Sequence, residues 1–397
     1  MGSALGILVC VLGAVSPGVD VLLGDLPDWL NGARVGLITN STGVDSTGRL
    51  TADRIHDDPR LKLVALFAPE HGIRGDVGAG AKVSDEVDPV TGVPVYSVYG
   101  LRKAPDLARL TGLDALLFDI QDVGARFYTY SSSMVKCMEA AREAGIPFVV
   151  LDRPNPQGGE KVEGWTVKEG YTSFISLYPI PIMHGMTVGE LARLYNEHFG
   201  VGCDLRVIKM KGWSRNMLFS DTGLKWLPTS PNVPTLETAY IYPGMGFAGE
   251  AGVISVGIGT DTPFRVVGAP WVDAEKFAAE LNRLEMSGVH FEPVQFTPDK
   301  GRFAGQLCRG ARIVLDDPAA FSTIRCGIHV LRLMRVMYPE QFLADFKSAP
   351  DSMFHIAAGT RVPADMLISG ESAWLIIKTF HEDVAAFEEL RRPYLLY

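Results

Sequence analysis

The sequence predicts an α/β protein in which a doubly wound parallel sheet domain is followed by a second, smaller α/β domain. Apolar runs of strand length alternate with polar loops and with segments of helical spacing, which is typical of such sheets. The run at residues 61–66 is apolar on both faces, as in a strand that helices cover on both sides. A chain of 397 residues that is 47% hydrophobic can bury more than one core, so we expect two domains.

The elements are expected in a regular order along the chain. In the first half we predict strands at residues 33–40, 61–66, 94–99, 113–120 and 146–151, and helices at 46–57, 104–110 and 131–144. In the second half we predict helices at 274–286, 321–337 and 373–390, and strands at 253–256 and 310–315. A proline-rich stretch at 227–234 precedes the domain junction, and we place the domains at 18–240 and 241–397.

Charge and cysteine content exclude several classes of function. The net charge is −9 and the sequence has no lysine and arginine cluster, which argues against a sequence-independent nucleic-acid binder. The five cysteines are scattered and form no C-x-x-C pair. They indicate neither a zinc knuckle nor a disulfide framework, and most are expected to be buried thiols. A small or uncharged substrate fits this composition better.

Residues 5–16 form an apolar run at the start of the sequence. The run is too short to span a bilayer but long enough for the hydrophobic region of a signal peptide. Ala14, Val15 and Ser16 resemble a small-residue cleavage site, although no lysine or arginine precedes the run. We expect an exported protein, periplasmic or secreted, without stable membrane insertion. A buried first strand in a cytoplasmic protein is the alternative.

The P-E-H-G motif at 69–72 is the first candidate for the site of chemistry. It follows the strand predicted at 61–66, and ligands of parallel sheets bind beyond the carboxyl ends of the strands. Glu70 is therefore our first candidate for the catalytic acid, with His71 beside it. The alternative is that Glu70 caps a helix or pairs with Arg74.

Four of the predicted strands end in polar side chains. Right-handed crossovers place the carboxyl ends of parallel strands at one edge of the sheet, so these side chains should share one polar mouth. Helix capping explains a single acid after a strand more easily than four such clusters. The residues are Asn40 and Thr42, then Glu70 and His71, then Asp119, Gln121 and Asp122, and finally Asp152, Arg153 and Asn155.

The loop that begins at Asp119 is the richest of these strand ends. It carries carboxylates, an amide, a guanidinium and phenols, a set that suits sugar hydroxyls, a sugar ring and a ligand carboxylate. Arg126 and Tyr128 are its candidates for contacting the ligand. An internal salt bridge from Arg126 to Asp122 or Asp119 is the structural alternative. Asp119, Asp122 and Asp152 could instead hold Mg²⁺, because hard cations take oxygen ligands.

Later segments offer further candidates for the wall of the cleft. Glu190 is expected to be structural, because Thr187 and Glu190 have the spacing of a capping box. The candidates for substrate contacts are Glu163, His184, Asn232, Tyr242 and Glu250.

Common cofactor motifs are missing from the sequence. G-x-G-x-x-G at 244–249 matches the dinucleotide fingerprint in letters only, because no long strand precedes it and a strand is expected after it. Neither G-x-S-x-G nor a phosphate-binding P-loop occurs. We therefore expect no cofactor.

Five motifs spread over the chain point to a known family. They are T-N-S-T-G at 39–43, P-E-H-G at 69–72, D-I-Q-D-V-G-A-R-F-Y-T-Y at 119–130, L-D-R-P-N-P at 151–156 and P-I-M-H-G-M-T at 181–187. Together they resemble the exo-β-N-acetylmuramidases of the NamZ type, over nearly the whole chain. The resemblance implies a Rossmann-like N-terminal domain, a smaller C-terminal domain and release of N-acetylmuramic acid from non-reducing ends of peptidoglycan fragments. It also implies that Glu70 is the catalytic carboxylate.

One departure from that family concerns the substrate. Where members commonly read G-R-G-T-T-R-P-F, this chain reads G-I-G-T-D-T-P-F at 257–264. Ile258 and Thr262 thus replace two arginines, and Asp261 adds a negative charge. If those arginines hold the acidic sugar, this protein binds it differently or prefers another glycoside.

The expected mechanism begins with Glu70, whose pKa is raised in a partly dry cleft, protonating the leaving glycosidic oxygen. Either a second carboxylate assists, or the acetamido group of the sugar attacks. Arg126 or Arg153 is expected to bind the lactyl carboxylate. Two other functions stay open, a Mg²⁺-dependent phosphoester hydrolase and a non-catalytic binder of cell-wall sugars. The candidates for the second carboxylate are Asp119, Asp122, Asp152 and Glu250.

Overall fold

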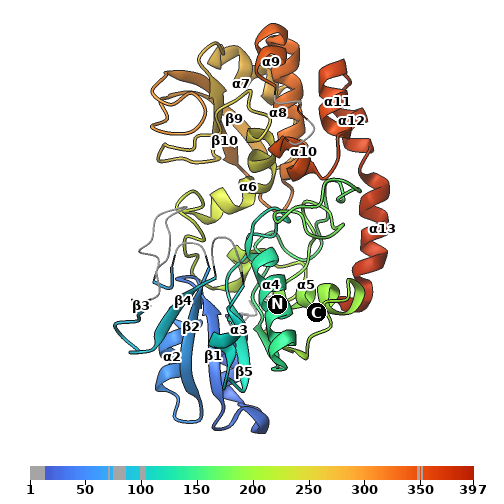
Figure 1. Ribbon diagram of the computed structural model, residues 1–397. Helices are drawn as coiled ribbons and strands as arrows, with labels where there is room; N and C mark the ends of the chain where they lie inside the picture. The colour runs from blue at the N-terminus through green and yellow to red at the C-terminus, as the bar shows by residue number, and fades with distance from the viewer. Residues whose placement is uncertain (1–13, 70–71, 75–85, 99–103, 347–348, 350–351) are drawn as a thin grey trace, which may run out of the picture.

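The computed structural model describes residues 14–69, 72–74, 86–98, 104–346, 349 and 352–397 of the chain (Figure 1). A seven-stranded sheet forms the lower domain in this view. Its strands lie in the order β3-β4-β2-β1-β5-β6-β7, and all neighbouring pairs are parallel except β3 with β4. The predicted fold class is thereby confirmed. The strands are β1 (Arg34–Thr39), β2 (Lys62–Ala68), β3 (Glu86–Val87), β4 (Pro94–Ser97), β5 (Ala115–Asp119), β6 (Phe148–Leu151) and β7 (Leu205–Ile208).

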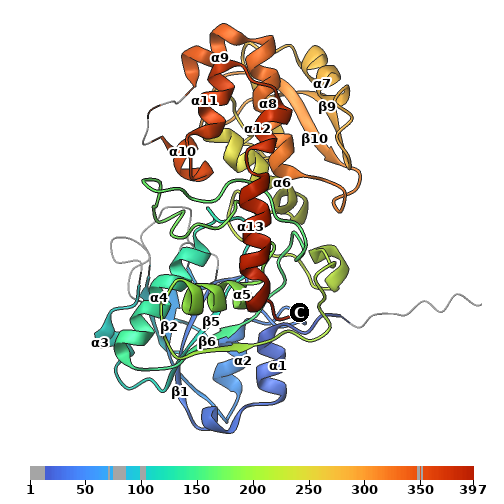
Figure 2. The same ribbon diagram turned by 90° about the vertical axis from the view of Figure 1, so that its right-hand side faces the viewer.

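Helices cover both faces of this sheet (Figure 2). They are α1 (Gly18–Gly24), α2 (Thr51–Asp57), α3 (Leu107–Leu110), α4 (Tyr130–Ala144) and α5 (Val188–Arg193). Leu22 of α1 and Ile55 of α2 join Leu37 of β1 in one buried apolar cluster. Met134 of α4 and Leu191 of α5 belong to the larger cluster on the opposite face. Burial on both faces explains why β5 is apolar up to its last residue.

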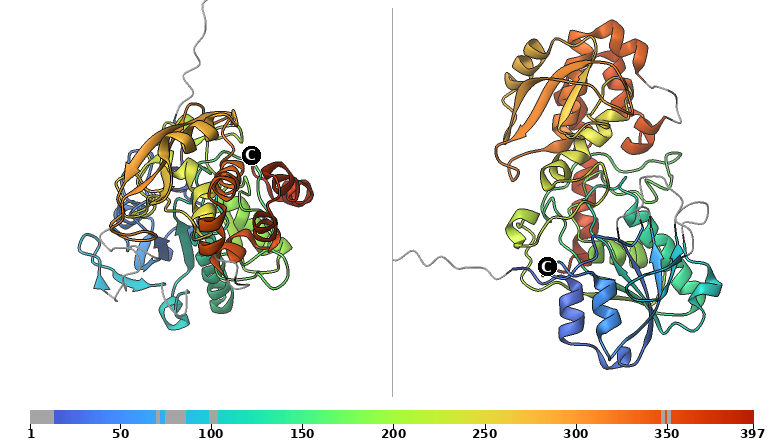
Figure 3. Two further views of the ribbon diagram at one scale, coloured as in Figure 1. Left: turned by 90° about the horizontal axis from the view of Figure 1, so that it is seen from above. Right: turned by 90° about the vertical axis from the view of Figure 1, so that its left-hand side faces the viewer.

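The second domain lies beyond the carboxyl-terminal edge of the large sheet (Figure 3). Its three strands are antiparallel and lie in the order β8-β10-β9. The strands are β8 (Val266–Ala269), β9 (Val289–Phe296) and β10 (Cys308–Leu315), and the helices are α7 (Ala274–Asn282), α8 (Thr323–Met337), α9 (Pro339–Asp345), α10 (Met353–Ala358), α11 (Val362–Ser369), α12 (Ala373–Lys378) and α13 (His381–Arg391).

Helix α6 (Leu236–Gly249) lies where the two domains meet and was not predicted, because it contains Pro243 and several glycines. Two glycines are required by its packing against α8. A Cβ on Gly244 would lie 1.8 Å from the carbonyl oxygen of Thr323, and a Cβ on Gly327 would lie 2.5 Å from that of Gly244. The helix backbones therefore approach closely at this crossing. The domain boundary predicted between residues 240 and 241 falls within α6 and stays a prediction.

The structure corrects two predicted elements. The helix at 373–390 is two helices, because the chain breaks at Thr379 and Phe380 to bury the Phe380 ring edge-on against Trp165. The strand at 253–256 is reduced to a single bridge between Ser255 and Gly268.

The chain returns to the first domain at its end. Helix α13 runs from the second domain down to α5 (Figure 2). Arg391 then donates to the backbone carbonyls of Gly185 and His184, at 2.6 and 3.0 Å. Among the described residues no helix is long and apolar enough to cross a membrane. The four described cysteines, Cys137, Cys203, Cys308 and Cys326, are free and buried, as predicted.

Candidate active site

The carboxyl ends of β1, β5 and β6 meet in one hydrogen-bonded rim. The hydroxyl of Thr42 donates to Oδ1 of Asn40 at 2.6 Å, and the same hydroxyl oxygen accepts from the backbone N–H of Gln121 at 3.0 Å. Nε2 of Gln121 donates to the carbonyl of Pro154 at 2.8 Å. The structure therefore brings together side chains that follow three different strands, as the parallel topology requires.

A buried ion pair lies within this strand-end rim. Nη2 of Arg153 lies 2.9 Å from Oδ2 of Asp119, Nε binds the other carboxylate oxygen, and the Thr51 hydroxyl of α2 donates to the same carboxylate. Both charged side chains are almost fully buried. Removing one partner of such a pair leaves an uncompensated charge in the interior. Asp119 therefore holds Arg153 in place, and its predicted contact with the substrate stays a prediction.

Glu70 and His71 lie outside the described residues, so their catalytic roles stay predictions. The described chain continues at Gly72, and Arg74 is held by two carboxylates. Its Nε and Nη2 bind Asp88 at 2.6 and 2.8 Å, and Nη2 binds Asp53 at 2.8 Å. Strand β2, which precedes the motif, lies beside β1 in the sheet.

Asp122 is buried, and only one of its two carboxylate oxygens has a hydrogen-bond partner among the described residues. Its Oδ1 accepts from the backbone N–H of Gly124 at 2.7 Å, whereas its Oδ2 has no hydrogen-bond partner among the described residues. Burial raises the pKa of Asp122 to about 7. The residue lines neither of the two cavities described below. The geometry therefore gives no support to its predicted catalytic role.

Asp152 is buried and bound by protein donors, and its predicted catalytic role stays a prediction. Its Oδ1 accepts from the backbone N–H groups of Arg153 and Gly189, at 2.9 and 2.8 Å. Its Oδ2 accepts from the hydroxyls of Thr187 and Tyr397, both at 2.8 Å. Burial raises the pKa of Asp152 to about 6 despite these donors. The four bonds tie β6 to the start of α5 and to the last residue of the chain.

Arg126 donates hydrogen bonds to backbone carbonyls from both domains. Its Nη1 donates to the carbonyls of Trp165 and Ile180 at 2.7 and 2.6 Å, and its Nη2 donates to that of Ala357 in α10. Burial lowers the pKa of Arg126 to about 9. The described residues include no ion pair from Arg126 to Asp122, so the proposed internal salt bridge is replaced by carbonyl contacts. These contacts leave little of Arg126 for a ligand carboxylate.

His184 and Asn155 are buried and also support loops. Nδ1 of His184 accepts from the backbone N–H of Met186 at 3.2 Å, and burial lowers the pKa of His184 to about 3. The imidazole is therefore neutral. Asn155 donates to the Met186 carbonyl at 3.0 Å and accepts from the backbone N–H of Gln157 at 2.9 Å.

Glu163 and Asn232 lie apart from the strand-end rim. Oε2 of Glu163 accepts from the backbone N–H of Ile324 at 3.3 Å, at the start of α8, and burial raises the pKa of this carboxyl. Asn232 is half-buried in a turn before α6. Neither residue lines the two cavities.

A row of aromatic side chains connects the strand-end rim to the domain junction. Nδ2 of Asn40 donates to the Tyr130 hydroxyl at 2.9 Å. The ring of Tyr128 lies edge-on between Tyr130 and Tyr242, with centroids 5.1 and 5.5 Å away. The Tyr128 hydroxyl is not directed at solvent, because it donates to Thr229 at 2.9 Å.

The largest described cavity lies at the domain junction and measures about 300 Å³. Phe264 forms part of its wall, and its φ of +63° is a strained value for a residue other than glycine. The centroids of the Phe264 and Tyr242 rings lie 5.0 Å apart. Sequence reasoning missed Arg302, which no motif marked, and did not name Phe264 as a wall residue although it ends the motif at 257–264. The wall includes Phe127, Tyr242, Glu250, Ile258, Phe264 and Arg302. We refer to this space as the junction cavity.

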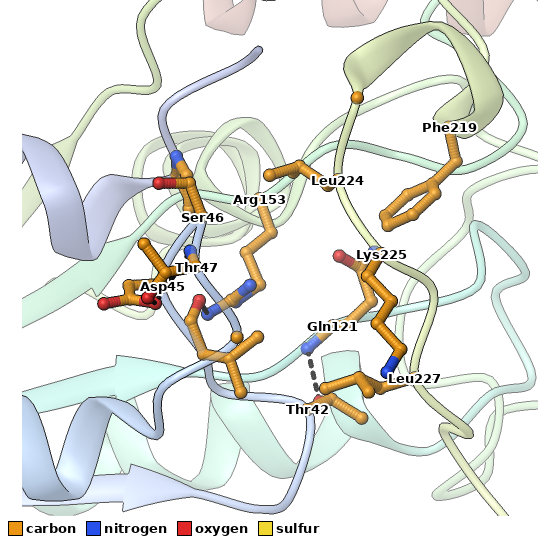
Figure 4. A pocket seen from close by; sticks show the side chains of 14 residues that line it. Thr42, Asp45, Ser46, Thr47, Gln121, Arg153, Phe219, Leu224, Lys225 and Leu227 are labelled. Atoms are coloured by element: carbon orange, nitrogen blue, oxygen red, sulfur yellow. Dashed lines mark hydrogen bonds between the residues drawn. The ribbon is translucent and has the colours of Figure 1, made fainter.

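A second cavity of about 130 Å³ lies between the strand-end rim and the loop that carries Lys225 (Figure 4). Thr42, Gln121 and Arg153 line it from the strand ends, and Phe219 and Lys225 line it from the loop. Three of the predicted strand-end residues thus share a pocket, which has no described lining residue in common with the junction cavity. We refer to it as the rim cavity.

No described group of three or more His, Cys, Asp or Glu side chains is arranged to hold a metal ion. The three aspartates considered for Mg²⁺ have separate protein environments. Asp119 is paired with Arg153, Asp122 accepts from a backbone N–H, and Asp152 has four donors. The geometry offers no support for the phosphoester hydrolase alternative.

Comparisons with known proteins agree with this architecture. Residues 35–237 match the family model of the exo-beta-N-acetylmuramidase NamZ N-terminal domain, and residues 240–397 match that of the C-terminal domain. The chain is 44% identical over 383 residues to the peptidoglycan beta-N-acetylmuramidase NamZ of Bacillus subtilis strain 168, covering 96% of this chain and 91% of that protein.

Two crystal structures of DUF1343 family proteins from Bacteroides fragilis have the same fold. One superposes with a TM-score of 0.89 at 39% identity, covering 97% of this chain and 99% of that one. The other has a TM-score of 0.76 at 30% identity, covering 96% and 99%. Because both family models match and a curated relative aligns over almost the whole chain, the chain belongs to the exo-beta-N-acetylmuramidase NamZ family.

Proposed function

We propose that this protein is an exo-acting glycoside hydrolase that releases N-acetylmuramic acid from the non-reducing ends of peptidoglycan fragments. The observation that carries the proposal is the junction cavity, which combines aromatic walls, a carboxylate and a guanidinium in one concavity. Aromatic faces suit sugar rings, and the charged groups suit a glycosidic bond and an acidic substituent. The Bacillus subtilis relative is named a peptidoglycan beta-N-acetylmuramidase.

Glu70 is proposed as the proton donor to the leaving oxygen. Its support is its place in the sequence, two residues after the end of β2, because ligands of parallel sheets bind beyond the carboxyl ends of the strands. A glutamic acid donates a proton near neutral pH only when its pKa is raised, which requires a site of low polarity.

Glu250 is proposed as the second carboxylate. Asp119 and Asp152 are fully engaged by protein donors, and Asp122 is buried away from both cavities. Glu250, at the end of α6, is the one of the four candidates that lines the junction cavity. The alternative is attack by the acetamido oxygen of the sugar, in which case Glu250 would only orient that group.

Arg302 is proposed to bind the lactyl carboxylate, in place of the earlier candidates Arg126 and Arg153. It lines the junction cavity together with Ile258. Its Nη2 pairs with Asp345 of α9 at 2.7 Å and its guanidinium lies 4.3 Å from the Phe303 ring centroid, and both contacts lie outside the cavity. A guanidinium suits recognition of a carboxylate.

The proposal is tested with a chromogenic β-N-acetylmuramide. The wild type should cleave it, Glu70→Gln should lose about 10²-fold or more in kcat, and the exposed control Glu169→Gln should keep full activity. Cleavage by Glu70→Gln at the wild-type rate would remove Glu70 from the mechanism. Failure of the wild type to cleave any β-N-acetylmuramide, chromogenic or peptidoglycan-derived, would overturn the function itself.

Export is proposed on the sequence of residues 5–16 alone. Fractionation of the source cells and N-terminal sequencing of the mature protein should find it outside the cytoplasm and shortened near Ala14 to Ser16. An intact N-terminus in the cytoplasmic fraction would contradict the proposal.

A further inference from the structure

We propose that the rim cavity is a second ligand site, which binds a small carboxylate carrying a hydrogen-bond donor next to the carboxyl group. No described residue lines both this cavity and the junction cavity. At about 130 Å³ it is smaller than the junction cavity, so it suits a ligand of a few carbon atoms. The inference is independent of the proposed glycosidase function.

One wall of the rim cavity presents a buried guanidinium. Nε and Nη2 of Arg153 are bound to Asp119 and to the carbonyl of Val44. Its Nη1 has no hydrogen-bond partner among the described residues, and Arg153 is only 3% exposed. The Asp119 pair holds the guanidinium in one orientation, so this nitrogen is a preorganised donor at the cavity wall.

The loop on the other side contributes a second cation. Lys225 lies across the cavity from Arg153 in Figure 4, and the described part of the chain provides no ion-pair partner for its ammonium. The other charges at the cavity are balanced. Asp45 is paired with Arg54, and Arg153 is paired with Asp119. Arg54 also lies 3.6 Å from Asp20, so Lys225 is the charged lining residue without a described ion-pair partner, and it favours an anion.

The remaining lining groups define the rest of the ligand. Nε2 of Gln121 donates to the carbonyls of Asp122 and Pro154. Its Oε1 can therefore accept a hydrogen bond from a ligand. That acceptor calls for a hydroxyl or amide N–H near the carboxylate. Leu224 and Leu227 provide an apolar wall for a short aliphatic part. A 2-hydroxy carboxylate such as lactate has all three features.

This chemistry has two sources, a free small acid and the lactyl group of a muramyl sugar. Methyl-labelled NMR separates both the sources and the cavities, because Leu224 and Leu227 report on the rim cavity and Ile254 and Ile258 report on the junction cavity. The full-length protein is titrated with D-lactate, with N-acetylmuramic acid and with neutral glycerol.

D-lactate should shift the Leu224 and Leu227 methyl signals saturably and leave those of Ile254 and Ile258 in place, and glycerol should shift neither. The exposed variant Lys225→Ala should weaken lactate binding by about fivefold to tenfold, and the exposed control Lys62→Ala should leave it unchanged. Saturable shifts of the same leucines with N-acetylmuramic acid would name the sugar as the source. Their absence would name the free acid.

Three results would overturn the proposal. They are no saturable lactate shift at Leu224 and Leu227, equal shifts with glycerol, and lactate binding that Lys225→Ala leaves unchanged. Glycosidase activity is measured on the same Lys225→Ala protein and is expected at the wild-type rate. The failure of the rim site and the failure of the proposed enzyme are thus separate outcomes.

Discussion

The hydroxyl of Tyr397, the last residue of the chain, donates to the buried carboxylate of Asp152 at 2.8 Å. The ring of Tyr397 packs edge-on against Trp213, and its hydroxyl oxygen also accepts from the backbone N–H of Met210 at 2.7 Å. Tyr397 thus packs onto a small apolar cluster of the first domain, although the helices before it belong to the second. The carboxyl terminus joins the two domains along α13.

Tyr397→Phe should therefore destabilise the protein without changing the junction cavity. The variant removes one donor from a buried carboxylate, which costs about 1–3 kcal/mol in the free energy of unfolding. Chemical denaturation should show this loss. Tyr394→Phe is the control, since the Tyr394 hydroxyl makes no hydrogen bond to another described residue and its loss should cost little. Equal stability of Tyr397→Phe and wild type would contradict a structural role for this bond.

Asp122→Asn should change how stability depends on pH. In the folded protein burial raises the pKa of Asp122 to about 7, whereas an unfolded aspartate titrates near 3.9. Between these values the folded state holds a proton that the unfolded state releases, so the wild type loses stability as pH rises. The loss is about 1.4 kcal/mol per pH unit and stops above about pH 7.

Unfolding free energies from pH 5 to pH 8 test this expectation. The stability of Asp122→Asn relative to the wild type should increase with pH up to about 7 and then stay level. Asp152 contributes equally to both proteins, so its titration cancels in the difference. Parallel pH profiles for the two proteins would show that Asp122 is ionised in the folded state throughout.

The first domain was predictable because its pattern is repeated. Each buried parallel strand is apolar on both faces and ends in polar residues, so β1, β2, β5 and β6 and the meeting of Thr42 with Gln121 follow from the sequence. The role of each polar residue did not follow. Asp119, Asp122 and Asp152 occupy similar places in the pattern, and only their tertiary partners distinguish them.

The junction cavity was harder to predict because its walls come from the second domain and from an unexpected helix. Pro243 and the glycines of α6 lower its helix propensity, and close packing against α8 overrides that preference. Arg302 lies in a loop and is distant from Ile258 in the sequence. The two residues come to line the same cavity only when the second domain folds. Tyr242 and Glu250 were found because they stand near the predicted domain junction.

Glu250→Gln should lower kcat on a chromogenic β-N-acetylmuramide by about 10²-fold to 10⁴-fold if Glu250 acts as the second carboxylate. The control is Glu169→Gln, an exposed change away from both cavities. The stereochemistry of the first product, followed by NMR, then distinguishes its role, because a nucleophile gives retention and a base gives inversion. An unchanged kcat, together with no cleavage of an analogue without the acetyl group, would assign the attack to the acetamido group instead.

Arg302→Met should reduce selectivity for the acidic sugar more than it reduces catalysis. Methionine keeps an apolar stem against the cavity wall but loses the guanidinium, so kcat/KM for the β-N-acetylmuramide should fall by about 10-fold to 100-fold. The matching β-N-acetylglucosaminide has no lactyl carboxylate, and its kcat/KM should change little. Arg312→Met, on an exposed part of β10, is the matched control and should leave both values unchanged. Equal losses on both substrates would mean that Arg302 supports the cavity wall through Asp345 and does not recognise the carboxylate.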